Sequence, residues 1–173
     1  MECVDETAST NADLLDTAFA RPDRSVLATG HQTAGRGRLD RRWDAPPGAN
    51  LLASMLFRRV PAAPNELTRR VGLAAVDACR AVAGVDAGLK WPNDVLVGDR
   101  KLAGVLAQRH PGGPVVVGIG LNVGWAPEGA ARLGDGVAPL DVLHALLHAY
   151  DRLPEDIGPR YRAALVTLGR PVQ

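Results

Sequence analysis

The chain has 173 residues, enough for one ordinary domain with a sizeable core. Hydrophobic residues make up 46% and charged residues 23%, so the composition is that of a globular protein and not of a disordered one. The 20 basic residues are matched by 19 acidic ones, and a net charge of +1 gives no general case for binding nucleic acid or an anionic membrane.

The first part of the chain is expected to contain two helices, two strands and a long loop. Residues 9–11 precede apolar residues at helical spacing, which predicts a short helix capped by one of the three. A strand is expected over 25–29, and a long loop over 30–48, where Gly, Arg, Pro and Asp dominate. A buried strand over 50–57 and an amphipathic helix over 65–82 follow.

Short strands joined by tight turns are expected in the second part, over residues 88–91, 95–97, 102–108 and 115–123. The last of them is fully apolar, so it should lie at the centre of a sheet. Helices are expected over 141–150 and 160–168. Too few helices separate the strands for a doubly wound parallel sheet. The sequence therefore predicts an α+β fold with a mixed, mostly antiparallel sheet and helices packed on one face.

Cysteine usage and the N-terminal sequence bear on the compartment. Cys3 and Cys79 lie far apart without CxxC spacing, so neither a zinc site nor a disulfide framework is indicated. The first residues are acidic where a signal peptide would be basic, and no apolar run approaches the ~20 residues that span a bilayer. We expect a cytoplasmic protein. The four histidines form no metal-ligand pattern, so metal ligands stay unassigned.

An arginine-rich loop is the first candidate binding segment. Residues 35–43 hold four arginines, two glycines and Trp43. Glycine lets backbone amides approach an anion closely, and a guanidinium group binds carboxylate or phosphate through two parallel hydrogen bonds. The alternatives are a solvated surface loop and a loop that binds nucleic acid.

Lysine usage singles out a second segment. Of the 20 basic residues only two are lysines, Lys90 and Lys101, and they flank a turn at 92–94. This usage indicates positions where a compact ammonium group cannot be exchanged for a guanidinium fork. We expect the two on neighbouring strands; the alternative is a hairpin with solvated lysines. Asn122, at the end of the apolar strand, is a further candidate contact, with turn formation as the alternative.

Taken together, six segments resemble the catalytic domain of biotin protein ligases, the enzymes that attach biotin to carboxylase carrier domains. They occur in the family's order over roughly residues 5–124, and several segments in order are far more specific than any one of them. The segments are residues 9–11, 32–38 with Arg41 and Trp43, 46–51, 90–94, 101–106 and 118–123.

The resemblance implies the class II synthetase-like fold of biotin and lipoate ligases and a two-step reaction. Biotin's carboxylate would attack the α-phosphorus of ATP, giving biotinyl-5′-AMP and pyrophosphate, and a lysine of a carrier domain would then take the biotin. Mg²⁺ would accompany ATP. The implied partner is the biotin carboxyl carrier domain of an acyl-CoA carboxylase. Dimerisation is left open, and neither DNA nor a membrane is an expected partner.

The resemblance also implies roles for the matched positions. Lys101, Arg36 and Arg38 would be catalytic, because they offset the repulsion between two anions. The residues implied for biotin are Ser9, Thr10, Asn11, Gln32, Gly35, Arg36, Gly37, Arg38, Lys101 and Gly104. The residues implied for the nucleotide are Arg38, Arg41, Trp43, Lys90, Asn93 and Asn122.

Three features depart from the usual family pattern. Asp40 stands where family loops usually have glycine, which affects the turn and the charge balance beside Arg38. No winged helix precedes Ser9, so the repressor role of some relatives is not expected. Residues 1–168 are expected to form the catalytic domain, and 169–173 the start of a truncated or absent SH3-like domain. The alternatives are a lipoate ligase or transferase of the same fold, and a non-catalytic module that binds biotin or its adenylate.

Overall fold

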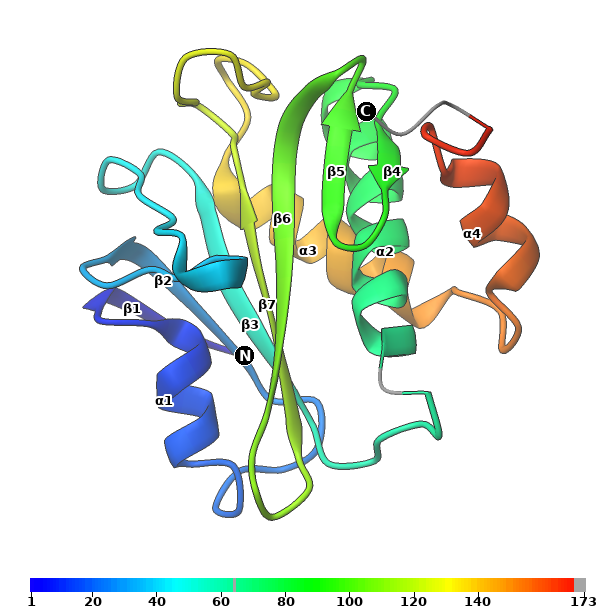
Figure 1. Cartoon of the computed structure of the whole chain (residues 1–173). Coiled ribbons are helices and arrows are strands. Elements are labelled where there is room, and N and C mark those ends of the chain that lie inside the picture. The colour runs from blue at the N-terminus through cyan, green and yellow to red at the C-terminus, as the bar shows by residue number, and fades with distance from the viewer. Residues whose placement is uncertain (64, 170–173) are drawn as a thin grey trace.

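One sheet of seven strands forms the centre of the molecule (Figure 1). The computed structural model describes residues 1–63 and 65–169, with residue 40 described by its backbone alone. The strands lie in the order β1-β2-β3-β7-β6-β5-β4; β1 is parallel to β2, and each further neighbour is antiparallel. The predicted mixed, mostly antiparallel sheet is confirmed. The strands are Glu2–Thr7 (β1), Val26–Gln32 (β2), Leu51–Phe57 (β3), Gly88–Lys90 (β4), Asp94–Val97 (β5), Arg100–Arg109 (β6) and Val115–Leu121 (β7).

Strand position in the sheet follows side-chain character. β7 lies in the middle, between β3 and β6, as its uninterrupted apolar sequence predicts. β1 lies at one edge, and its side chains are mostly polar and exposed. Because an edge strand of this kind carries no apolar alternation, sequence reasoning missed it.

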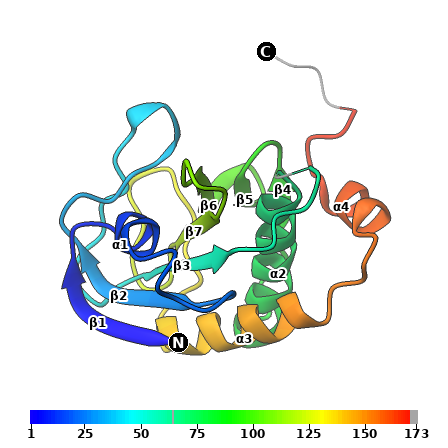
Figure 2. The same cartoon turned by 90° about the horizontal axis from the view of Figure 1, so that it is seen from below.

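The helices cover both faces of the sheet. The two long ones, α2 (Asn65–Ala83) and α3 (Pro139–Asp151), pack against each other on one face, and α4 (Gly158–Ala164) packs beside α2. The short helix α1 (Thr10–Asp16) lies on the other face, against β2, β3 and β7. Figure 2 shows α1 and α3 on opposite sides of the sheet. The prediction that the helices pack on one face was therefore wrong for α1.

Side-chain parity along the strands explains this second layer. Met55 and Phe57 of β3 point into the larger core with α2 and α3, whereas Leu56 points into a smaller cluster with Leu14 of α1. Val116 of β7 belongs to the same smaller cluster. Successive side chains of a strand point to opposite faces of the sheet. A strand whose side chains are apolar on both faces therefore needs other elements packed on both sides. Each large apolar side chain so buried contributes about 1.5–3 kcal/mol.

The helix ends agree with the sequence at α1 and differ at α4. Ser9 is the N-cap of α1, and its Oγ accepts a hydrogen bond from the Ala12 N–H at 3.5 Å, which confirms the predicted cap. α4 is shorter than the helix predicted over 160–168. The chain leaves α4 to pair with β4, where the Val166 N–H donates to the Leu89 carbonyl at 3.0 Å.

The expected domain boundary at residue 168 lies near the C-terminal end of what the structure describes, and residues 170–173 lie outside the described residues. The boundary stays a prediction. Within residues 1–63 and 65–169, no helix is long and apolar enough to cross a membrane.

Candidate active site

A cavity of about 410 Å³ opens on the face of the sheet that α1 covers. Its walls come from α1, β6, β7, the segment between β4 and β5, and the loop that follows β2. All but one of the site residues expected from the sequence line it, namely Ser9, Thr10, Asn11, Gln32, Arg36, Gly37, Arg38, Arg41, Trp43, Lys90, Asn93, Lys101, Gly104 and Asn122. The exception, Gly35, is buried at the wall, where a Cβ would lie 3.0 Å from Gln32 Nε2.

A network of polar side chains lies at one end of the cavity. Gln32 Oε1 accepts hydrogen bonds from the Thr10 N–H at 2.9 Å and from the Thr10 hydroxyl at 3.1 Å. Ser54 Oγ lies 2.7 Å from the Thr10 hydroxyl and donates to Asn11 Oδ1 at 2.6 Å. The Asn11 amide donates in turn to Gln108 Oε1 at 2.7 Å. Buried hydrogen-bond networks of this kind fix side-chain positions, so this end of the cavity is preorganised for a small polar group.

Glycines form the floor of the cavity on β6 and β7. A Cβ at Gly118 would lie 2.2 Å from Asn11 Oδ1, and one at Gly120 would lie 2.4 Å from Trp43 Cε2. At Gly104 a Cβ would lie 3.3 Å from Trp43 Cζ3. Only glycine therefore lets these side chains rest directly on the strand backbone.

Trp43 and Lys101 meet above this floor. The Lys101 ammonium lies 5.4 Å from the centroid of the indole ring, within the range of a cation–π contact, and 2.9 Å from Asp94 Oδ1. Within residues 1–63 and 65–169, Trp43 Nε1 is the one buried side-chain nitrogen or oxygen without a hydrogen-bond partner. A buried unpaired N–H costs about 1–3 kcal/mol. An acceptor group on a ligand would remove that cost.

Residues 35–43, called the lid hairpin from here on, fold back on themselves beside the cavity. At the base, the Trp43 N–H donates to the Gly35 carbonyl at 3.0 Å. At the tip, Leu39 adopts a left-handed backbone conformation with a φ of 56°. The turn is thus made at Leu39. The side chain of Asp40 lies outside the described part of the chain, so its expected effect on the charge balance beside Arg38 stays a prediction.

One contact joins the tip of the lid hairpin to the opposite wall. Arg38 Nη1 donates to Asn93 Oδ1 at 3.3 Å. Asn93 is itself fixed, because its Nδ2 donates to the Val105 carbonyl of β6 at 3.0 Å. The lid hairpin is therefore held across the cavity by a side chain that is anchored on the sheet.

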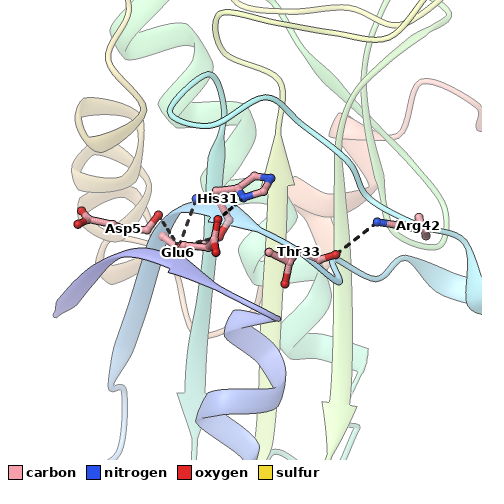
Figure 3. A network of polar contacts seen from close by, with 6 residues as sticks. Asp5, Glu6, His31, Thr33 and Arg42 are labelled. Atoms are coloured by element: carbon pink, nitrogen blue, oxygen red, sulfur yellow. Dashed lines mark hydrogen bonds and ion pairs between the residues drawn. The ribbon is translucent and has the colours of Figure 1, made fainter.

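One polar contact ties the base of the lid hairpin to the residue that follows β2, and another joins β2 to β1 (Figure 3). Arg42 Nη2 donates to the Thr33 carbonyl at 3.3 Å, and His31 Nδ1 lies 2.9 Å from Glu6 Oε2 on β1. Arg42 also pairs with Asp44 at 3.1 Å. Of the four arginines in the lid hairpin, this one is engaged in holding its base.

Asn122 lies at the wall of the cavity, but its amide is engaged within the protein. Its side chain is buried, with Nδ2 donating to the Ala131 carbonyl at 2.9 Å and Oδ1 accepting from Asn50 Nδ2 at 3.3 Å. Asn50 Oδ1 accepts from the Val123 N–H at 2.9 Å. Both asparagines therefore hold the segment that follows β7, and a contact of Asn122 with nucleotide stays a prediction.

Lys90 and Lys101 line the same cavity but lie two strands apart. Lys90 is on β4 and Lys101 on β6, so the expectation of neighbouring strands was wrong. The short strand β5 separates them. Its first residue, Asp94, is the partner of Lys101, although sequence reasoning gave it only a role in the turn. Ser54 was also missed; its signal was a lone hydroxyl inside an apolar strand.

The residues that the structure describes contain no group of three or more His, Cys, Asp or Glu side chains that could hold a metal ion. The chain thus presents no protein cage for Mg²⁺ within 1–63 and 65–169.

The fold and this cavity define an α+β domain with one cationic and polar binding cavity, and comparison with known proteins gives its family. Residues 1–124 match the Biotin/lipoate A/B protein ligase family. A biotin--[acetyl-CoA-carboxylase] ligase of Mycobacterium tuberculosis is 38% identical over all of this chain and 73% of its own length. One of Paracoccus denitrificans is 35% identical over 94% of this chain and 73% of its own length. The chain belongs to the Biotin/lipoate A/B protein ligase family.

Solved structures agree with this membership. A biotin protein ligase of Aquifex aeolicus in complex with biotin and ATP is 27% identical, with a TM-score of 0.81 over 96% of this chain and 78% of that chain. A biotin protein ligase of Leishmania major in complex with biotinyl-5-AMP is 21% identical and shares the fold, with a TM-score of 0.85 over 99% of this chain and 83% of that chain. The resemblance and the ligase class inferred from the sequence are confirmed.

Proposed function

We propose that this chain converts biotin and ATP to biotinyl-5′-AMP and pyrophosphate and transfers the biotin to a lysine of a biotin carboxyl carrier domain. The observation that carries the proposal is the composition of one cavity. It combines a neutral hydrogen-bonding pocket around Thr10 and Gln32 with three cations, Lys101, Arg36 and Arg38. A neutral ureido ring and a reacting carboxylate and triphosphate need these two environments side by side. The biotin ligases among the relatives support the same assignment.

In the first step a carboxylate oxygen of biotin bonds to the α-phosphorus of ATP, and the bond to the pyrophosphate oxygen breaks. Both reactants are anions, so cationic groups must offset their repulsion and the charge that develops on transfer. Lys101 supplies a compact charge that Asp94 and the Trp43 ring hold in the cavity. Arg36 and Arg38 add guanidinium groups from the lid hairpin, which bind carboxylate or phosphate through parallel hydrogen bonds.

In the second step the acceptor lysine, as a free amine, attacks the acyl carbon of the mixed anhydride, and AMP leaves. Between the steps the adenylate must be kept from water, because it hydrolyses. The lid hairpin serves this purpose, and the contact from Arg38 to Asn93 holds it closed. Opening of the tip breaks this exposed hydrogen bond.

Within the cavity we place biotin against the polar network and the nucleotide toward Lys90 and Asn122. The expected biotin contacts are Ser9, Thr10, Asn11, Gln32, Arg36, Gly37, Arg38, Lys101 and Gly104, with Gly35 behind Gln32, and those expected for the nucleotide are Arg38, Arg41, Trp43, Lys90, Asn93 and Asn122. The unpaired Trp43 Nε1 supports its place among them. Mg²⁺ enters as the MgATP substrate. A cytoplasmic location, the catalytic domain over 1–168 and the absence of a DNA partner stay predictions, and dimerisation stays open.

Transfer to a carrier domain tests the proposal. The protein is incubated with biotin, MgATP and a biotin carboxyl carrier domain, and mass spectrometry measures biotin on the carrier. A carrier whose acceptor lysine is replaced by arginine is the control, and lipoate in place of biotin tests the choice of acid. We expect one biotin per carrier and no lipoate. Lipoylation would favour a lipoate ligase, and binding of biotin without turnover would favour a non-catalytic module.

A further inference from the structure

Two strongly exposed apolar side chains stand at the mouth of the cavity. Leu39, at the tip of the lid hairpin, is 83% exposed, and Trp91, just after β4, is 65% exposed. Both line the cavity, so they lie at its rim and not on a remote surface. Neither has a role in the binding of biotin or nucleotide proposed above. A Trp exposed in this way is the side-chain type that most often anchors a protein interface.

The two side chains come from separate segments that one contact brings together. The hydrogen bond from Arg38 to Asn93 joins the residue next to Leu39 to the turn that begins at Trp91. In this structure the contact places the segments that carry Leu39 and Trp91 on the same rim. If the lid hairpin opens, the two side chains separate.

The same rim is basic. Two carboxylates of the rim are each paired with a cation, Asp44 with Arg42 and Asp94 with Lys101. Four further cations of the rim are exposed, and no ion pair joins them to a carboxylate whose side chain the structure describes; they are Arg36, Arg38, Arg41 and Lys90. Their field extends about 8 Å at physiological ionic strength, beyond the cavity itself. A protein that approaches this rim is favoured if its own surface is acidic.

We propose that Leu39 and Trp91 form the docking surface for the carrier domain, and that the partner presents an apolar side chain and acidic groups around its acceptor lysine. This inference rests on the proposed function, because only a macromolecular acceptor must dock at the mouth while its lysine reaches into the cavity. Since the pair is complete only when the lid hairpin is closed, the carrier binds best after the adenylate has formed. Docking and shielding of the adenylate thus use the same closed state.

The test separates docking from chemistry. Leu39→Ala, Trp91→Ala and the double variant are compared with the parent chain, and Leu140→Ala is the matched control, since Leu140 is 46% exposed on α3, on the far face of the sheet. Biotin-dependent exchange of pyrophosphate into ATP measures the first step. Cleavage of the adenylate by hydroxylamine measures acyl transfer to a small nucleophile. The KM for the carrier domain measures docking.

Trp91→Ala, which lies outside the lid hairpin, is expected to raise the KM for the carrier about tenfold or more, with pyrophosphate exchange and hydroxylamine cleavage within about twofold of the parent, and the double variant is expected to raise that KM further. Leu140→Ala is expected to change none of the three. A carrier KM within about twofold of the parent in the double variant would overturn the docking surface while leaving the proposed function intact. Absence of pyrophosphate exchange in the parent chain would overturn the proposed function, and this inference with it.

Discussion

The Lys101 ammonium lies 2.9 Å from the Asp94 carboxylate, across the adjacent strands β6 and β5. Both side chains line the cavity, and they are 41% and 27% exposed. A pair this exposed contributes at most about 1 kcal/mol to folding. Its main consequence is therefore orientation, because the carboxylate holds the ammonium where two anionic substrates would meet.

Asp94→Asn tests this orientation. The variant keeps a side chain of the same size but removes the charge that holds Lys101, so we expect pyrophosphate exchange to fall about tenfold and the free energy of unfolding to change by no more than about 1 kcal/mol. In a Lys101→Ala background the same substitution should have no further effect on exchange. Equal losses in both backgrounds would show that Asp94 acts independently of Lys101.

Arg38→Ala tests the closure of the lid hairpin. The substitution removes the hydrogen bond to Asn93, which is worth about 1 kcal/mol, so we expect the adenylate to escape into water about fivefold faster. Quenched samples analysed for free biotinyl-5′-AMP give this rate. Arg109→Ala, at an exposed position toward the other end of β6, is the control. Unchanged retention of the adenylate would argue that the lid is not held by this contact.

Ser54→Ala tests the polar network. Ser54 is 1% exposed and contacts both Thr10 and Asn11; without its hydroxyl, Asn11 Oδ1 would lose its hydrogen-bond donor, whereas the Thr10 hydroxyl would keep its bond to Gln32. We expect a loss of about 1–3 kcal/mol in the free energy of unfolding, measured in urea, and weaker binding of biotin by calorimetry. Ser25→Ala, whose hydroxyl donates to the Pro22 carbonyl at the surface, should change stability by less than about 0.5 kcal/mol. Similar losses in the two variants would contradict this account of the network.

The buried thiol of Cys79 gives a pH dependence of stability. Burial on α2 raises the pKa of Cys79 from its ordinary value of 9.0 to about 12. Above about pH 9 the unfolded thiol loses its proton while the folded one keeps it, so this group lowers the free energy of unfolding as pH rises. Cys79→Ala should remove that contribution, whereas Cys3→Ala, at an exposed position, should not. Urea titrations at about pH 8 and about pH 10 give the free energy of unfolding of each variant at both pH values. The same change in that free energy in Cys79→Ala and Cys3→Ala would refute the prediction.

Sequence reasoning identified the residues that the cavity collects better than it identified their partners. Residue type and spacing marked Lys101, because lysine is rare in this chain. They could not pair it with Asp94, because that pairing depends on the register of β5 against β6, which shifts after Val95. Registers of short strands follow from tertiary packing, which a local pattern does not contain.

The same limit applies to the fold. The apolar run of β3 predicted a buried strand, and the structure confirms it. The side chains of β3 alternate between the two faces of the sheet, with Leu56 and Ser54 facing α1 and Met55 facing the larger core. The sequence of β3 does not say which helix covers each face. The edge strand β1 is held by backbone pairing with β2, so its exposed acidic side chains carry no sign of it.

Biotin-dependent exchange of labelled pyrophosphate into ATP tests the central claim most directly, since it reports adenylate formation without a carrier protein. We expect exchange that requires both biotin and MgATP, and a loss of about 10²-fold or more in Lys101→Ala, with the fold retained by circular dichroism. Arg100→Ala, an exposed neighbour on β6, should exchange normally. A well-folded parent chain without biotin-dependent exchange, or full activity in Lys101→Ala, would contradict the claim.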